Sequence, residues 1–430
     1  MRDLIQSFLN QAQEDDDRLF PFMANKKNFD PARDTVYYSG PFWDHQEVGE
    51  AIHSMVKGKW LSSGEKVARF EKHFGERFNL PYNVMVNSGS SANLVMLAAL
   101  KKYFGWADGD EIIVCACGFP TSIAPIVQNN LTPVFVDINW NDLNWDLDQV
   151  ESRITSRTRA VLSSPVLGNP YDIDRIVDIC QRRGIELIAD NCDSLGSRWR
   201  GQYLTDWAVA ASCSFYPAHH LCTMEGGMVS SRNPEIVALA RSLSWWGRDC
   251  HCVGAQNLIP CGMCGERFKE WLPGYEGVVD HKYVFTNMGY NLKPLDLQGG
   301  IGLVQLRKWD QIHSLRRSNK ERIHSIVEGI PGVRVIGEHE AAETSWFGVP
   351  IVCENKAQKT QLVNHLEANR IQTRNYFAGN ILQHPGYQHL GDSSDYPNAS
   401  QVLDRVFFLG CSPTITDPMI DYIQEQVNSL

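Results

Sequence analysis

Short apolar runs alternate with stretches of helical periodicity between about residue 80 and residue 235. Apolar runs of four to seven residues, bounded by polar or turn-forming residues, are typical of buried strands. The predicted strands are Glu111–Cys115, Val134–Asp137, Ala160–Leu162, Glu186–Asp190, Val209–Phe215 and Met228–Ser230. Strands that alternate with helices in this way predict an α/β fold, with a mostly parallel sheet covered by helices.

The pattern changes on both sides of this region. Residues 1–60 predict helices and a connecting arm, and residues 245–285 form a long excursion rich in Gly, Cys and Pro. A helix is predicted over roughly Leu295–Ile312, after which helix and strand alternate again to the C-terminus. We therefore expect an N-terminal arm (1–60), a large domain (61–310) that includes the cysteine-rich loop, and a smaller C-terminal α/β domain (311–430).

Composition narrows the class of protein. The chain has 430 residues and a net charge of -10, and an acidic balance disfavours nucleic acid or an anionic membrane as partner. No apolar run reaches 18 residues, and the acidic, amphipathic N-terminus does not resemble a signal peptide, so we expect a cytoplasmic protein. In that reducing compartment the 12 cysteines point to metal binding or catalysis rather than to disulfides.

The first chemical motif is the segment Asn87–Asn93, which reads NSGSSAN and is followed by the helical pattern LVMLAAL. The free N–H groups and the dipole at a helix start attract an anion, and serine hydroxyls add donors. An ordinary serine N-cap is the alternative.

Two further motifs follow in the same region. Asp190 ends a predicted strand, where open α/β sheets bind ligands, and its carboxylate could keep a pyridine nitrogen protonated. Capping of the next turn is the alternative. Ser214 then opens a loop that carries His219 and His220 and leads to Glu225-Gly226-Gly227. Adjacent histidines on such a loop could be general bases, metal ligands or surface residues.

The order of these motifs resembles the DegT/DnrJ/EryC1/StrS sugar aminotransferase family, and the resemblance extends from Gly58 to Thr416. It implies the fold of the fold-type-I pyridoxal-phosphate (PLP) transferases, with a large mostly parallel-sheet domain and a smaller C-terminal α/β domain. It also implies a homodimer, because the asparagine that matches Asn291 reaches the partner's cofactor. The cofactor-binding residues that the resemblance implies are Gly89, Ser90, Ser91 and Ser214 for the phosphate, Asp190 and Asp193 near the ring, Phe119 stacked on it, and Asn291.

One position departs from the family's aminotransferases. The residue five positions after Ser214 and six before Glu225 is their cofactor-binding lysine, and here it is His219. The chain also has no lysine between Lys102 and Lys269. Imidazole cannot replace a lysine amine as a covalent anchor, so we expect pyridoxamine phosphate (PMP) held non-covalently. His219 is then the predicted catalytic base, with an ordinary pKa of about 6.5. A decayed, non-catalytic relative is the alternative.

The cysteines are a second departure. Four thiolates can hold a [2Fe–2S] cluster or a zinc ion, and five cysteines lie in or beside one lobe. The resemblance is to the family's lysine-less, iron–sulfur branch, and it implies a [2Fe–2S] cluster. The implied metal ligands are Cys192, Cys250, Cys252 and Cys264, with Cys261 as the alternative fourth ligand.

That branch implies a 3-dehydrase that removes the C3 hydroxyl of a nucleotide-linked 4-keto-6-deoxyhexose, CDP-4-keto-6-deoxy-D-glucose above all. Such a step serves 3,6-dideoxyhexose biosynthesis for bacterial lipopolysaccharide O-antigen. The sequence has no flavin or nicotinamide motif, so an NADH-dependent flavin/iron–sulfur reductase is expected as a separate partner. The candidate substrate residues are Trp60, Ser63, Gly64, His220, Arg374 and His384.

Three other interpretations remain open at this stage. The chain could be a cluster-independent 3-dehydratase or an aminotransferase that acts on a GDP- or dTDP-linked keto-sugar. It could be an aminotransferase that recruits a distant lysine. It could also be a non-catalytic binding protein stabilised by zinc.

Overall fold

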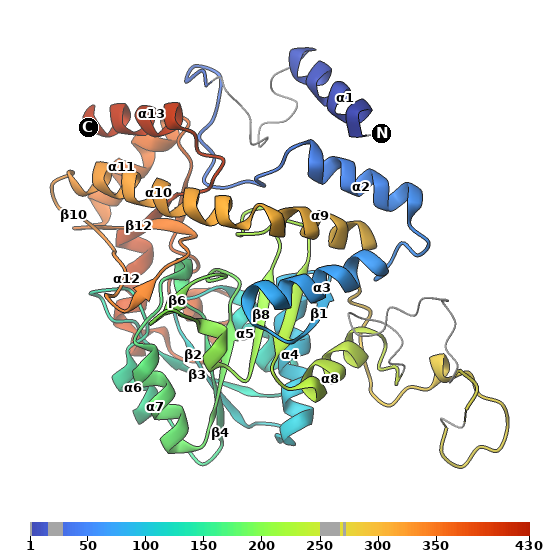
Figure 1. Cartoon of the computed structure of the whole chain (residues 1–430). Helices are drawn as coiled ribbons and strands as arrows, with labels where there is room; N and C mark the ends of the chain where they lie inside the picture. The colour runs from blue at the N-terminus through green and yellow to red at the C-terminus, as the bar shows by residue number, and fades with distance from the viewer. Residues whose placement is uncertain (1, 16–28, 250–266, 270–271) are drawn as a thin grey trace.

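The structure, a computed structural model, describes residues 2–15, 29–249, 267–269 and 272–430. Its centre is a seven-stranded sheet in the order β1-β9-β8-β5-β4-β2-β3 (Figure 1). The pairings from β8 to β3 are all parallel, whereas β9 runs antiparallel to both of its neighbours. The strands are β1 (Tyr82–Val86), β2 (Glu111–Cys115), β3 (Thr132–Val136), β4 (Thr158–Ser163), β5 (Glu186–Asp190), β8 (Ala210–Ser214) and β9 (Gly227–Ser231). The prediction of a mostly parallel sheet is confirmed.

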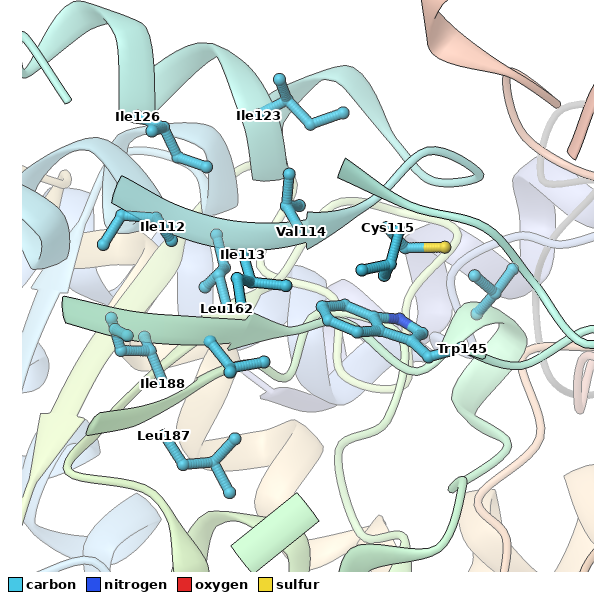
Figure 2. Packing of buried hydrophobic residues seen from close by; sticks show 14 of the residues in the cluster. Ile112, Ile113, Val114, Cys115, Ile123, Ile126, Trp145, Leu162, Leu187 and Ile188 are labelled. Atoms are coloured by element: carbon cyan, nitrogen blue, oxygen red, sulfur yellow. The ribbon is translucent and has the colours of Figure 1, made fainter. Parts of the chain in front are cut away.

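Burial on both faces explains why the central strands are apolar at most positions. Figure 2 shows the packing on β2, where Ile123 and Ile126 point from a covering helix toward the strand that carries Ile112 and Val114. All four side chains are almost completely buried. The helices of this part are α4 (Gly89–Phe104), α5 (Pro120–Gln128), α6 (Leu147–Ser152), α7 (Ile173–Arg183) and α8 (Pro234–Ser244).

A second sheet lies in the C-terminal third of the chain, coloured orange to red in Figure 1. It is antiparallel throughout, in the order β10-β12-β14-β13. Its strands are β10 (Val333–Val335), β12 (Gly348–Cys353), β13 (Thr373–Asn375) and β14 (Val406–Gly410), and the helices around it are α10 (Trp309–Glu328), α11 (Lys356–Ala368), α12 (Pro397–Arg405) and α13 (Asp417–Asn428).

The contacts between the parts include a helix cap and a small sheet. The Asp137 carboxylate, just after β3, accepts the N–H groups of Asn398 and Ala399 at 2.9 and 2.8 Å and so caps the start of α12. A small sheet pairs β11 (Ala342–Glu343) with β6 (Arg198–Trp199), which also pairs β7 (Gln202–Tyr203). Short 3-10 turns complete the described structure at Val166–Gly168, Leu204–Trp207, His281–Tyr283, Ile381–Gln383, Gln388–Leu390 and Ser393–Asp395.

The single helix expected over Leu295–Ile312 is wrong in its bounds. Two helices meet there, α9 (Asp296–Arg307) and α10, with Lys308 between them. The Lys308 ammonium lies 3.0 Å from Asp44 and 2.7 Å from Glu47, so ion pairs tie this junction to a distant part of the chain. Those two acids form the capping box of α2 (His45–Lys57), and α3 (Glu65–Phe78) packs along α9.

The N-terminal α1 (Arg2–Asp15) precedes these helices. Among the helices that the structure describes, none has the length and apolar character needed to cross a membrane.

Candidate active site

The three motifs meet where β8 ends and α4 begins. A Cβ atom on Gly89 would stand 2.5 Å from the Cβ of Ser214, and one on Gly227 would stand 2.2 Å from the Ser88 carbonyl oxygen. These contacts are too close for any side chain, so the glycines allow the helix start to rest directly on the strand ends. The first turn of α4 therefore lies beside Ser214, as an anion site at this position requires.

The serines at the start of α4 have different structural roles. Ser88 is the N-cap, and its hydroxyl accepts the N–H of Ser91 at 3.1 Å. The capping alternative is thus realised by Ser88, while Ser90 stays exposed and Ser91 is half-buried. The cap leaves the Ser90 hydroxyl available for an anion, because nothing in the cap uses it.

Asp190 lies buried at the end of β5 and is surrounded by donors. Its carboxylate accepts the Asn93 amide at 2.9 Å, the Ser122 hydroxyl at 2.6 Å and the Ser212 hydroxyl at 3.3 Å. These three donors fix the orientation of the carboxylate at the end of the strand, where a pyridine nitrogen could approach it. The Asn93 side-chain oxygen is also buried and has no partner within the described residues.

Phe119 stands one helical turn before Ser122, which donates to this carboxylate. It is the N-cap of α5, and its carbonyl accepts the N–H of Ser122 at 3.1 Å. The ring is 52% exposed, although Phe377 meets its edge at 6.0 Å between centroids. An exposed aromatic face this close to Asp190 fits a planar ring bound against it.

His219 lies on the turn after β8, with its Nδ1 atom 3.7 Å from an Asp193 carboxylate oxygen. Within the described residues Nδ1 is buried without a hydrogen-bond partner. Burial lowers the pKa of His219 to about 4, and the charge of Arg316 adds to this effect. Burial and the neighbouring Asp190 raise the pKa of Asp193 to about 8. Near neutral pH the imidazole is therefore uncharged and able to accept a proton.

His220, predicted to contact substrate, is placed differently from His219. It is buried, its Nε2 donates to the Ser345 carbonyl at 2.9 Å, and its ring packs near Trp309 and Phe347. The substrate prediction is not supported by this placement, because the ring is enclosed by protein and serves packing. The turn directs one histidine to the site and its neighbour into the core.

The N-terminal substrate candidates share one face with the Asn291 segment. Ser63 is buried, and its N–H donates to the Pro294 carbonyl at 3.0 Å, while Trp60 is 69% exposed. A Cβ on Gly64 would stand 2.8 Å from the Asp296 carboxyl carbon. Asn291 is exposed, and its neighbour Leu292 accepts the N–H of Asn87 at 2.9 Å, so this segment lies beside the serine turn.

The two C-terminal substrate candidates, Arg374 and His384, lie on separate segments near the candidate site. Arg374 on β13 lies over the Tyr38 ring, 4.1 Å from its centroid. Burial raises the pKa of Tyr38, and Asp193 is among the charges that act on it, so this pair lies toward the His219 site. His384 donates to the Ala378 carbonyl at 2.8 Å, on the segment that contacts Gly118 beside Phe119. That bond occupies one nitrogen of His384 in holding the loop.

Cys192 is the one predicted metal ligand that can be located. Its thiol is close to Asp190, and burial together with that carboxylate raises its pKa. The other predicted ligands, Cys250, Cys252, Cys264 and the alternative Cys261, lie outside the described residues. Within the ranges that the structure does describe, no group of three or more His, Cys, Asp or Glu side chains is arranged to hold a metal ion.

Three residues at the site were missed in the sequence. Ser122 could have been found, because it stands three residues after Phe119 on the same helical face. Tyr38 and the buried Arg316 gave no sequence signal, since each reaches the site through tertiary contacts with distant segments.

Comparison with known proteins agrees with this geometry. The chain is 40% identical over 380 residues to a dTDP-4-dehydro-2,6-dideoxy-D-glucose 3-dehydratase of Saccharopolyspora spinosa, which covers 85% of this chain and 80% of that protein. It is 32% identical over 431 residues to the lipopolysaccharide biosynthesis protein RfbH of Salmonella typhimurium, covering 96% and 97% of the two chains. An E. coli GDP-4-keto-6-deoxy-D-mannose-3-dehydratase solved with bound hydrated PLP superposes with a TM-score of 0.79 and 29% identity, over 92% of this chain and 100% of that chain.

The structural likeness confirms the predicted α/β fold, shared with PLP-dependent aminotransferases, and the relatives include sugar-nucleotide 3-dehydratases. The model of one family matches residues 44–428, which is most of the chain. The chain belongs to the DegT/DnrJ/EryC1/StrS aminotransferase family.

Proposed function

We propose that this chain is a PMP-dependent 3-dehydrase that removes the C3 hydroxyl of a nucleotide-linked 4-keto-6-deoxyhexose. The observation that carries the proposal is the position of His219. An uncharged imidazole stands in the site, beside Asp193, where the family's aminotransferases have a lysine. Relatives of 40% and 33% identity are named as 3-dehydratases of sugar nucleotides, which supports the same reaction class here.

The residues present fit PMP. The start of α4 rests on Ser214 and offers free N–H groups and the Ser90 hydroxyl to a phosphate. Asp190 is held by three side-chain donors in a form suited to a pyridinium nitrogen, and the Phe119 ring is exposed nearby. When bound, PMP supplies an amine that condenses with the substrate ketone and a ring that withdraws electrons.

The protein residues then have separate roles. The uncharged His219 imidazole can take up the proton lost from carbon and return it to the C3 hydroxyl, which then leaves as water. Asp193, within 3.7 Å of Nδ1, orients the imidazole. Asp190, oriented by Asn93, Ser122 and Ser212, would hold the ring nitrogen of the bound cofactor. Asn291 of a partner subunit completes the phosphate site in the proposed homodimer.

The nucleotide is part of the proposal. The resemblance of the cysteine pattern favours a CDP-linked sugar, and a role in lipopolysaccharide synthesis is in keeping with a relative of that description. A dTDP-linked sugar is the second candidate, because the 40% identical relative is named for a dTDP-linked substrate.

Replacement of the hydroxyl by hydrogen is a two-electron reduction, and it needs an electron source. We assign this role to an NADH-dependent flavin/iron–sulfur reductase, with a [2Fe–2S] cluster on Cys192, Cys250, Cys252 and Cys264 of this chain. The support is the sequence pattern of these cysteines and the position of Cys192 beside Asp190. The GDP-linked relatives offer a cluster-independent alternative.

The decisive test measures water loss apart from reduction. The full-length protein is incubated with PMP and a CDP-, dTDP- or GDP-linked 4-keto-6-deoxyhexose in H₂¹⁸O, without reductase, and C3 is analysed by mass spectrometry. Reversible dehydration inserts ¹⁸O at C3, and the nucleotide that gives the fastest insertion is the substrate. His219→Asn should abolish insertion while PMP still binds, and the exposed His389→Asn serves as the matched control.

Each outcome bears on one part of the proposal. Full ¹⁸O insertion by His219→Asn would refute the role of His219, and transamination with glutamate in place of insertion would favour an aminotransferase. Borohydride trapping of the cofactor on the protein would point to a recruited lysine. Iron and acid-labile sulfide in anaerobically purified protein support the cluster, whereas zinc or no metal refutes it.

A further inference from the structure

Arg316 on α10 is a charged side chain in the core. Its residue surface is 1% exposed, and among the described residues it forms no ion pair with a carboxylate. Its Nη2 atom instead donates to the carbonyls of Ala218 and His219 at 3.1 and 3.0 Å, and Nη1 lies 3.5 Å from the Phe347 carbonyl. Burying a guanidinium without a paired carboxylate is costly in free energy, so its position here needs a structural or functional explanation.

The next residue on the helix shows the ordinary arrangement. Arg317 has a side chain that is 33% exposed, and it pairs with Glu338 at 3.2 Å. It also donates to the Thr344 carbonyl at 2.8 Å, away from the histidine turn. The two arginines therefore share a helix and a residue type, but only Arg316 holds the turn that carries His219.

The Ala218 and His219 carbonyls depend on Arg316 to different degrees. The Ala218 carbonyl also accepts the Ser39 hydroxyl at 2.8 Å, so it keeps a partner if Arg316 is removed. Arg316 is the one donor to the His219 carbonyl in the part of the chain that the structure covers. Loss of the guanidinium thus frees the peptide of His219 itself, while the residue before it stays anchored.

We infer that Arg316 is a positioning residue for His219, fixing the peptide on which the imidazole is carried. The His219 N–H already donates to the Tyr216 carbonyl at 2.9 Å, and Arg316 restrains the other end of the same residue. With both ends held, the direction of the side chain is set by the backbone. A charged donor makes this restraint stronger than a neutral one would. The inference rests on the proposed role of His219 as the base.

The test compares Arg316→Met and Arg316→Lys with Arg317→Met as the matched control. Arg316→Met should lower kcat on the order of 10²-fold, as expected for a misplaced catalytic group, with KM and PMP affinity within about twofold. Arg316→Lys keeps the charge on a shorter side chain, which weakens the contacts that Nη2 makes with the Ala218 and His219 carbonyls, so its kcat should fall between. Hydrogen exchange at the His219 amide should accelerate in the same order, and Arg317→Met should match the wild type in every measurement.

Several results would overturn the inference. Wild-type kcat or unchanged exchange at His219 in folded Arg316→Met would do so, and so would equal losses in PMP affinity and kcat, which indicate a purely structural role. If Arg316→Met does not fold, Arg316→Lys decides, because wild-type kcat and exchange in that variant refute the inference and a lower kcat at unchanged KM supports it. The exchange measurement needs no substrate, so a failure of the proposed reaction leaves this arm intact.

Discussion

The contact between Gly89 and Ser214 allows a sharp test of the phosphate site. In Gly89→Ala the new methyl carbon would stand 2.5 Å from the Ser214 Cβ and 2.9 Å from its hydroxyl oxygen. Carbon atoms pack best at about 3.5–4.0 Å, so α4 and β8 must separate by about 1 Å. Overpacking of this kind costs about 1–3 kcal/mol, and the helix start and the strand end that move apart are the walls of the proposed site.

If the PMP phosphate binds between the start of α4 and the end of β8, the overpacking in Gly89→Ala should weaken PMP binding. A loss of about 1–3 kcal/mol corresponds to a dissociation constant raised about 5- to 150-fold. Equilibrium titration with PMP measures this loss, and urea unfolding of the same samples measures stability. Gly337→Ala is the control, since a Cβ there meets no atom within 4 Å. PMP affinity within twofold of wild type in Gly89→Ala, together with reduced stability, would show that phosphate binds elsewhere.

Three further predictions concern single contacts. Ser122→Ala removes the 2.6 Å bond to Asp190, and the loss of a donor to this buried carboxylate should weaken PMP binding by about 1–3 kcal/mol, measured by the same titration. Asp137→Ala leaves the first N–H groups of α12 without their cap and should lower the free energy of unfolding by about 2 kcal/mol in urea; an unchanged midpoint would contradict this. The third concerns pH. Hydrogen bonds from Arg159 hold the pKa of Asp110 below its usual value of about 3.9. The ionised pair therefore stabilises the fold above that pH, and this stabilisation is lost as the pH falls through the lowered pKa. Asp110→Asn should therefore be less stable than wild type at pH 7 and approach it as the pH falls through the lowered pKa of Asp110, whereas stability curves that stay parallel would refute the assignment.

The sheet could be predicted from the sequence because its strands are buried on both faces and so read as continuous apolar runs. β1 was missed although four of its five residues are buried. It lies at the edge of the sheet, and within the described structure it pairs with the antiparallel β9, which follows some 140 residues later in the chain. The boundary between α9 and α10 was missed as well, because Lys308 at the junction keeps a helical backbone conformation and no glycine or proline marks the break.

The site shows the same division between local and long-range information. Gly89, Asp190 and Ser214 could be identified because each stands at the end of a strand or the start of a helix, where the fold itself brings ligands. The spacing from Ser214 and Glu225 separated His219 from His220, but both stand on one turn, and only its backbone decides which ring enters the site. That decision depends on Arg316, which lies 97 residues away from His219 in sequence. The identity of the base is thus a local fact of the chain, but its direction is a property of the packed helix α10. A substitution on that helix should therefore alter catalysis without touching any residue that the motifs identify.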